Sequence, residues 1–221
     1  YVDGLNATRS IIRLQTYASN YLASGQRFFL AVGFKKPHLP FVSPKAYWDL
    51  YDPAQINLTG YTGFKTMPTG TLAFAAPGST EPVSYDDING TNDTGTINVN
   101  DARRLIHGYL AAASFMDAQL GRVLAALDAS GVASNTIVVL WGDHGWHLGD
   151  HNGFWAKHSN FEQAARSPLL FRAPGMAALG TAGSRCHAPV ELVDVFPTLV
   201  DLCSLPVPSQ PPGLAMQGAT L

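Results

Sequence analysis

The stretch Ile137–Phe161, which reads IVVLWGDHGWHLGDHNGFWAKHSNF, decides the fold of this 221-residue chain. It opens with the short, β-branched apolar run Thr136–Trp141, which is typical of a buried strand. The chain then breaks at Gly142 and presents Asp143 and His144 side by side. Because α/β sheets bind their ligands at the carboxyl ends of strands, this pattern predicts a functional site directly after the strand.

The loop after this strand concentrates titratable and aromatic side chains. Four of the chain's seven histidines lie between His144 and His158, and Trp146, Trp155 and Lys157 share the same loop. Each residue also has an ordinary interpretation, since an aspartate after a strand can cap a helix and a histidine or tryptophan can simply pack. Their concentration in a loop punctuated by glycines favours a pocket over a core.

A second group of polar residues follows the predicted strand Arg27–Gly33. Lys35, Lys36 and His38 lie just beyond its end. If both strands are parallel neighbours, their carboxyl ends open on the same edge of the sheet, and the two loops could face one pocket. Taken alone, His38 could equally be a loop histidine packed between two prolines.

The rest of the chain alternates helices with strands. Apolar residues at helical spacing predict a helix over Ala7–Ala23, stopped by Gly25, and a second helix from the cap at Asn100-Asp101 to about Gly131. Further elements are predicted at Leu169–Arg172 (strand) and Val190–Cys203 (helix). This alternation predicts an α/β fold with a mostly parallel sheet flanked by helices.

We interpret residues 1–221 as belonging to one α/β domain. Residues 53–98 are rich in glycine, threonine, proline and asparagine and show little periodicity, which predicts an irregular insertion. A C-terminal lobe could begin after about residue 174, and composition does not decide between these two organisations.

Charge and hydropathy narrow the class of protein. The 14 Lys and Arg residues nearly balance the 16 Asp and Glu residues, so no nucleic-acid partner is expected. No apolar run approaches the ~20 residues that span a bilayer, so no transmembrane segment is expected. The chain begins at Tyr1 without a signal-like segment, and we interpret it as a piece of a longer or processed protein.

Four sequons lie in mostly polar surroundings and favour a secreted, glycosylated protein. Their asparagines are Asn6, Asn57, Asn89 and Asn92. The two cysteines, Cys186 and Cys203, match no zinc-binding spacing and leave the redox compartment open.

Three segments together resemble the type I sulfatases of the alkaline-phosphatase-like superfamily, and most closely the iduronate-2-sulfatase-like branch. They are FLAVGFKKPHLPF at Phe29–Phe41, DHGWHLGDH at Asp143–His151 and WAKHSNF at Trp155–Phe161. The Asp-His-Gly core is common to the whole superfamily, whereas the KPHxPF loop and the WxLG(D/E)H…WxK extension are more specific. The resemblance implies a sulfatase-like α/β fold, incomplete in this chain.

The resemblance also implies roles for individual residues. Asp143 and His144 would hold a divalent metal, calcium in this family, while Lys157 and His38 would bind sulfate. His38 would in addition protonate the leaving alcohol, and Trp146 and His147 would line the substrate pocket. These roles are chemically coherent, because a metal and fixed cations stabilise the charge that gathers on sulfate oxygens during attack.

One family feature is missing from the chain. Type I sulfatases carry a C-x-P-S-R type motif whose cysteine or serine becomes the formylglycine nucleophile. Here Cys186 is followed by His-Ala-Pro and Cys203 by Ser-Leu-Pro, so neither matches. We therefore expect the formylglycine upstream of this chain, in a C-terminal sulfatase portion that is inactive on its own.

Two alternatives remain open. A zinc-dependent phosphodiesterase or phosphatase of the same superfamily would suit the imidazole of His144, because zinc accepts nitrogen ligands more readily than calcium does. A non-catalytic remnant would keep the fold without the chemistry. Under the sulfatase interpretation we expect a sulfated carbohydrate or another sulfate ester as substrate, and a secreted or lysosomal location.

Overall fold

The computed structural model describes residues 1–56, 58, 69–70, 81, 88, 97–209 and 216–221. The chain divides into two compact units, Tyr1–Pro174 and Gly175–Leu221. The helices of the first unit are α1 (Val2–Ser24), α2 (Lys45–Trp48), α3 (Val99–Asp128), α4 (Asp150–Gly153) and α5 (Glu162–Ala165), with 3-10 turns η1 (Pro53–Gln55) and η5 (Ala133–Asn135). Its strands are β1 (Val138–Trp141) and β2 (Leu169–Arg172), and the second unit holds η6 (Leu192–Asp194) and α6 (Val195–Leu202).

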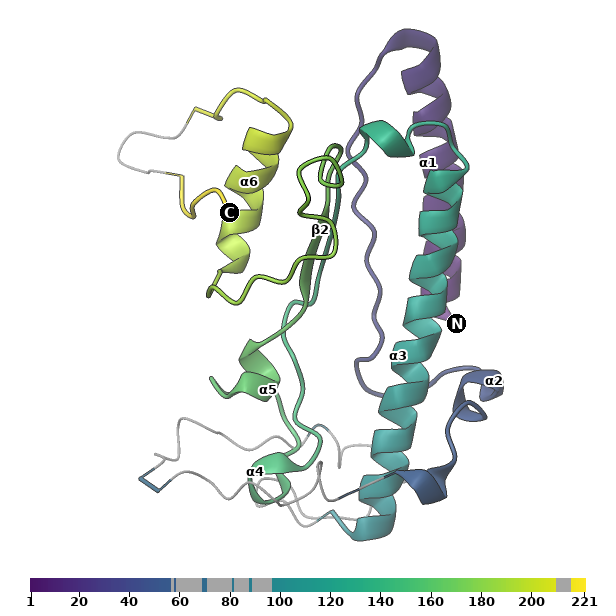
Figure 1. Ribbon diagram of the computed structural model, residues 1–221. Helices are drawn as coiled ribbons and strands as arrows, with labels where there is room; N and C mark the ends of the chain where they lie inside the picture. The colour runs from purple at the N-terminus through teal and green to yellow at the C-terminus, as the bar shows by residue number, and fades with distance from the viewer. Residues whose placement is uncertain (57, 59–68, 71–80, 82–87, 89–96, 210–215) are drawn as a thin grey trace. The chain divides into compact units, whose positions relative to one another are not determined.

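Helix α1 confirms the first predicted helix and extends it toward the N-terminus. It ends where expected, because Gly25 adopts the left-handed conformation (φ 73°) and its N–H donates to the Tyr21 carbonyl at 2.8 Å. Ala7, Leu14 and Ala18 are buried along one face. Figure 1 shows α1 lying alongside α3, which covers that face.

Helix α3 begins before the predicted cap. Asn98, not Asn100, is the N-cap, and its side-chain oxygen accepts from the N–H groups of Asn100 and Asp101 at 3.0 Å. The buried face is wide, since it includes Ile106 and Phe115 as well as Leu105 and Leu127. The reason is that α3 serves two apolar clusters, one with α1 and one with the loop around His38.

Helix α3 is long and apolar enough, by length and composition alone, to cross a membrane. From the hydropathy of the sequence, no transmembrane segment is expected. A core helix meets the same criterion, and the two clusters that α3 joins within the first unit favour that interpretation.

The strands β1 and β2 pair antiparallel, with Val138 opposite Arg172 and Trp141 opposite Leu169. Both strands were predicted, but among the described residues they form a two-stranded sheet and not a parallel one. The prediction of a buried strand at Arg27–Gly33 is wrong for the described chain, because this segment is extended but unpaired and Phe29 is 80% exposed.

The second unit contains only part of the helix predicted at Val190–Cys203, as a 3-10 turn followed by α6. The Asp194 carboxylate accepts from the N–H groups of Glu191 at 2.9 Å and Ala219 at 2.8 Å. These two hydrogen bonds, the one from Glu191 first, lower the pKa of Asp194. Cys186 and Cys203 are both free. Most of the predicted insertion at 53–98 lies outside the described residues.

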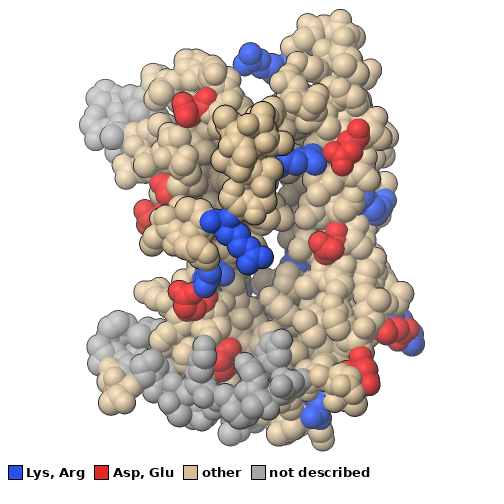
Figure 2. Space-filling model, in the orientation of Figure 1, with Lys and Arg blue, Asp and Glu red and all other residues tan. Residues whose placement is uncertain are grey.

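Acidic and basic side chains are interspersed on the face drawn in Figure 2, as expected for a chain with a net charge of -2. A surface of this kind gives little long-range attraction for a polyanion, so any recognition of an anionic group must come from individual cations in a site.

Candidate functional site

The end of β1 is fixed by backbone contacts. The Gly142 N–H donates to the Pro168 carbonyl at 3.0 Å, which extends the strand pairing by one step. The Gly145 N–H donates to the Ala164 carbonyl at 2.7 Å. A Cβ atom on Gly145 would overlap the Gln163 carbonyl oxygen. Glycine is therefore required behind Asp143-His144 because another segment of backbone passes too close for a side chain.

The side chains of Asp143 and His144 form an exposed pair. The Asp143 side chain is 85% exposed, and its Oδ1 accepts from the His144 N–H at 3.1 Å. His144 Nδ1 lies 2.7 Å from the Gly145 carbonyl, which can only accept, so Nδ1 carries the proton. In the neutral ring the lone pair is then on Nε2, 3.7 Å from Asp143 Oδ2.

This pair offers one carboxylate oxygen and one neutral imidazole nitrogen on the same side of the loop. Zinc binds both ligand types, and calcium prefers the oxygen. The donor set thus fits a divalent cation with further ligands from elsewhere, and it does not by itself distinguish the two metals.

The loop that carries His38 is held from two directions. The Asp3 carboxylate of α1, 1% exposed, accepts from the N–H groups of Lys35 at 2.8 Å and Lys36 at 2.9 Å. Lys36 Nζ donates to the carbonyls of His38, at 3.0 Å, and Pro40. Burial, followed by the charge of Lys35, lowers the pKa of Lys36, while Asp3 raises it. Lys36 therefore fastens the loop and is not a free surface cation.

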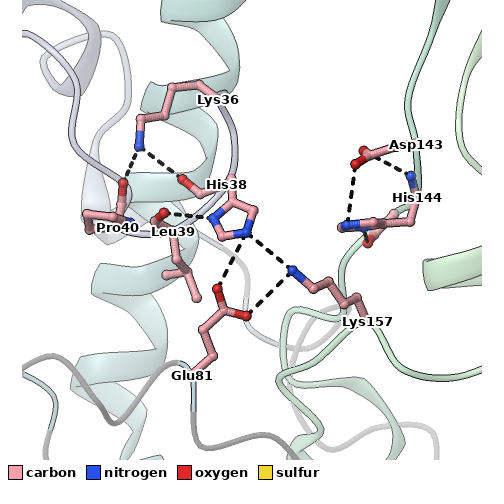
Figure 3. Close-up of polar contacts among 9 residues, drawn as sticks. Lys36, His38, Leu39, Pro40, Glu81, Asp143, His144 and Lys157 are labelled. Atoms are coloured by element: carbon pink, nitrogen blue, oxygen red, sulfur yellow. Dashed lines mark hydrogen bonds and ion pairs between the residues drawn. The ribbon is translucent and has the colours of Figure 1, made fainter. Parts of the chain in front are cut away.

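Figure 3 shows that this loop places the His38 ring in contact with Lys157 and Glu81. His38 Nδ1 lies 2.7 Å from the Leu39 carbonyl, so Nδ1 carries the proton and Nε2 can accept from Lys157 Nζ at 3.2 Å. Glu81 contacts both partners, at 3.5 Å from His38 Nε2 and 3.6 Å from Lys157 Nζ. The Lys157 ammonium also lies 5.7 Å from the centre of the Trp146 ring, within the range of a cation–π contact.

The structure thus brings His38 and Lys157 into contact although they are 119 residues apart. Asp143 and His144 form a second pair, and in Figure 3 their polar atoms point toward the side where His38 and Lys157 lie. Within the described part of the chain no hydrogen bond or ion pair joins the two pairs.

The structure places His147 differently from the other predicted site residues. Its side chain has 0% exposure. Nδ1 is hydrogen-bonded to the Asp150 carboxylate, and Nε2 lies 2.8 Å from Ser159 Oγ. A buried ring with both nitrogens engaged is not available to a substrate, so the pocket-lining role expected for His147 finds no support in its surroundings.

His147, Asp150 and His151 also offer potential metal-ligating atoms within 4.8 Å of one another. His151 Nδ1 is buried without a hydrogen-bond partner. However, both nitrogens of His147 already have partners, the Asp150 carboxylate and Ser159 Oγ. This cluster is therefore a weaker candidate for a metal site than the exposed pair Asp143 and His144.

Sequence reasoning missed Asp3, Glu81 and Ser159. An aspartate in the first turn of a helix is usually explained by the helix dipole, and Asp3 carried no other signal. Glu81 lies in the aperiodic region 53–98, and Ser159 is a single hydroxyl in a loop. Each was hidden because its partners are far away in sequence or revealed only by tertiary packing.

A model of the sulfatase family, described as "Sulfatase", matches residues 7–205. The chain belongs to the sulfatase family. Human iduronate 2-sulfatase is 38% identical over 213 residues, covering 86% of this chain and 38% of its own length. A sulfatase of Formosa agariphila is 35% identical over 206 residues, covering 87% and 35%, respectively.

Solved structures confirm the sulfatase-like fold class. The phosphonate monoester hydrolase of Silicibacter pomeroyi superposes with a TM-score of 0.64 at 26% identity, covering 92% of this chain and 39% of that one. The chain therefore spans about two fifths or less of the length of these three relatives.

Proposed function

We propose that the protein containing this chain hydrolyses sulfate esters, and that this chain supplies two parts of the active site. One part is the pair of the His38 imidazole and the Lys157 ammonium group, and the other is the metal-holding pair Asp143 and His144. The observation that carries the proposal is the 3.2 Å contact between Lys157 Nζ and His38 Nε2, since it gathers two anion-binding groups from distant segments.

Lys157 suits the binding of a sulfate group. Its side chain is only 18% exposed, and the Trp146 ring lies near its ammonium group. A cation that is partly withdrawn from water interacts more strongly with charge that develops on substrate oxygens than an exposed one does. We assign Lys157 to the stabilisation of this charge.

His38 suits proton transfer to a leaving alcohol. The Leu39 carbonyl holds the proton on Nδ1, so a second proton would enter at Nε2, the atom that faces Lys157. The Glu81 carboxylate, 3.5 Å from Nε2, would stabilise the resulting imidazolium. A histidine in this state can donate from Nε2 to an alkoxide oxygen.

A divalent cation at Asp143 and His144 would withdraw negative charge from the sulfate oxygens, and a formylglycine from outside this chain would provide the nucleophile. We propose calcium, as the family resemblance implies. The imidazole of His144 keeps zinc as the alternative.

We propose a sulfated sugar as the substrate and a secreted or lysosomal location. The substrate proposal is supported by the relative named iduronate 2-sulfatase. Of the four sequons, only Asn6 lies in the described residues, where it is part of α1 and its side-chain amide donates to the Gly33 carbonyl at 3.1 Å. Glycosylation is therefore better sought at Asn57, Asn89 and Asn92.

A second candidate is the hydrolysis of phosphonate or phosphate esters, which the structural likeness to a phosphonate monoester hydrolase favours. The pairs described above would also bind a phosphoryl group, because they recognise an anionic tetrahedral centre and not its central atom. Only the comparison of substrates separates the two candidates.

The test uses the complete protein with an aryl sulfate, an aryl phosphate and an aryl phosphonate monoester. We expect kcat/KM to be highest for the sulfate, and Lys157→Met to lower it about 100-fold or more. Lys45→Met is the matched control, because Lys45 is an 84% exposed lysine whose ion pair among the described residues is with Asp49. A preference for the phosphonate would select the second candidate, and no turnover of any ester would support a non-catalytic remnant.

A further inference from the structure

The buried His147 and the partly buried Asp150 and Ser159 form a chain of hydrogen bonds close to Lys157. The ionised Asp150 carboxylate can only accept, so His147 Nδ1 carries the proton that joins them. The neutral ring then has its lone pair on Nε2, which accepts from the Ser159 hydroxyl at 2.8 Å. Ser159 Oγ in turn accepts from the Phe161 N–H at 3.4 Å. Every polar atom of the buried His147 ring is thereby satisfied.

This chain of hydrogen bonds ends on both sides of Lys157. The His147 N–H donates to the carbonyl of Ala156, the residue before Lys157, at 2.9 Å. The His147 ring holds Ser159, whose own N–H donates to the Lys157 carbonyl at 2.9 Å. A single buried residue therefore fixes the backbone immediately before and after the lysine.

The packing around these contacts leaves the lysine backbone little freedom. Phe154, Trp155 and Ala156 are all buried, and the ring of Phe154 lies 4.7 Å from that of His147. The position of Lys157 Nζ relative to His38 thus depends on a segment whose preceding residues are packed in the interior.

We propose that His147, held by Asp150 and acting through Ser159, is a positioning residue that sets the Lys157 ammonium against His38. The inference rests on the proposed function of Lys157 as a sulfate-binding cation. This proposal assigns a role to His147, whose buried ring cannot contact a substrate.

The order carboxylate, imidazole, hydroxyl is also that of a serine hydrolase triad. In such a triad the imidazole must pass a proton to the leaving group, and His147 has no exposed surface from which to do so. Ser159 also accepts a backbone hydrogen bond at its oxygen. The arrangement is therefore assigned to support and not to nucleophilic attack.

The test is a double-mutant cycle in the complete protein. Ser159→Ala removes one half-buried hydroxyl without leaving a large cavity. Ser24→Ala is the matched control, because the hydrogen bonds of the Ser24 hydroxyl in the described part of the chain are local, to the Asn20 carbonyl and from the Gln26 N–H. We expect Ser159→Ala to lower kcat/KM and the affinity for inorganic sulfate about fivefold to tenfold, the size of one lost hydrogen bond. In the Lys157→Met background the same change should have no effect.

The outcomes separate this inference from the proposed function. An equal loss in both backgrounds, or an activity of Ser159→Ala equal to that of Ser24→Ala, would overturn the positioning role while leaving the function of Lys157 intact. Full activity of Lys157→Met would overturn both. Asp150→Asn is a second variant, in which the metal content of the purified protein is measured. If the unchanged protein held one transition metal ion per chain and Asp150→Asn lost it, the cluster would be a metal site and the hydrogen-bonded assignment would be refuted.

Discussion

The anchoring of the His38 loop by Asp3 allows a quantitative prediction. Asp3 is 1% exposed, and its carboxylate receives hydrogen bonds from two consecutive backbone N–H groups. A hydrogen bond to a charged group contributes about 1.5–3 kcal/mol, and we take the lower end because the donating residues Lys35 and Lys36 are more exposed than Asp3. Asp3→Ala should therefore lower the free energy of local opening of this loop by about 3 kcal/mol, a factor of about 100 in its equilibrium constant.

Amide hydrogen exchange of a peptide covering residues 33–41 measures this opening directly. The control is Asp49→Ala, which removes a 57% exposed carboxylate paired with Lys45 and should change stability by about 1 kcal/mol or less. Because the same loop presents His38, kcat/KM of the complete protein should also fall in Asp3→Ala. If exchange in this peptide were equally fast in the two variants, the anchoring role of Asp3 would be refuted.

Further predictions concern the turn after β1 and the second unit. Gly145→Ala should lower the melting temperature, because its Cβ would overlap the Gln163 carbonyl, whereas Gly121→Ala on α3 meets open space and should not. Asp143→Ala should abolish metal-dependent turnover with little change in melting temperature, since this side chain is 85% exposed; retained turnover would remove it from the metal site. The lowered pKa of Asp194 means that its stabilising contribution is complete above the ordinary value of 3.8 and disappears as the pH falls through the lower, folded-state value. The protection factors of the α6 amides, which correct for the pH dependence of intrinsic exchange, should therefore fall across this acid range, and Asp194→Asn should remove that dependence.

Elements defined by local signals could be predicted closely from the sequence. Gly25 ends α1 as expected, and β2 has the predicted bounds Leu169–Arg172. Elements whose structure depends on pairing with a distant segment could not be predicted in this way. A strand exists only through its neighbours, so the apolar run at Arg27–Gly33 did not reveal that it would lie unpaired, and the sequence of β1 did not reveal an antiparallel partner.

The candidate site shows the same division. His38, Asp143 and Lys157 could be selected because their chemistry and their motifs point to anion and metal binding. The groups that hold them could not, because a buried aspartate such as Asp3 looks like any acidic residue at the start of a helix. His147 was expected to line the pocket because of its chemistry, but its side chain is buried. The sequence pattern of a loop does not show which of its residues face inward.

The antiparallel pairing of β1 with β2 holds the two ends of the segment between them next to each other. Trp141 is opposite Leu169, and the Gly142 N–H reaches the Pro168 carbonyl, so both ends of the segment 142–168 are tied to each other. Asp143 and Lys157 therefore lie within one closed loop and should open and close as a single cooperative unit. A substrate or ion that orders either residue would then also raise the hydrogen-exchange protection of the backbone around the other. The two parts of the site would thus be coupled through the segment 142–168.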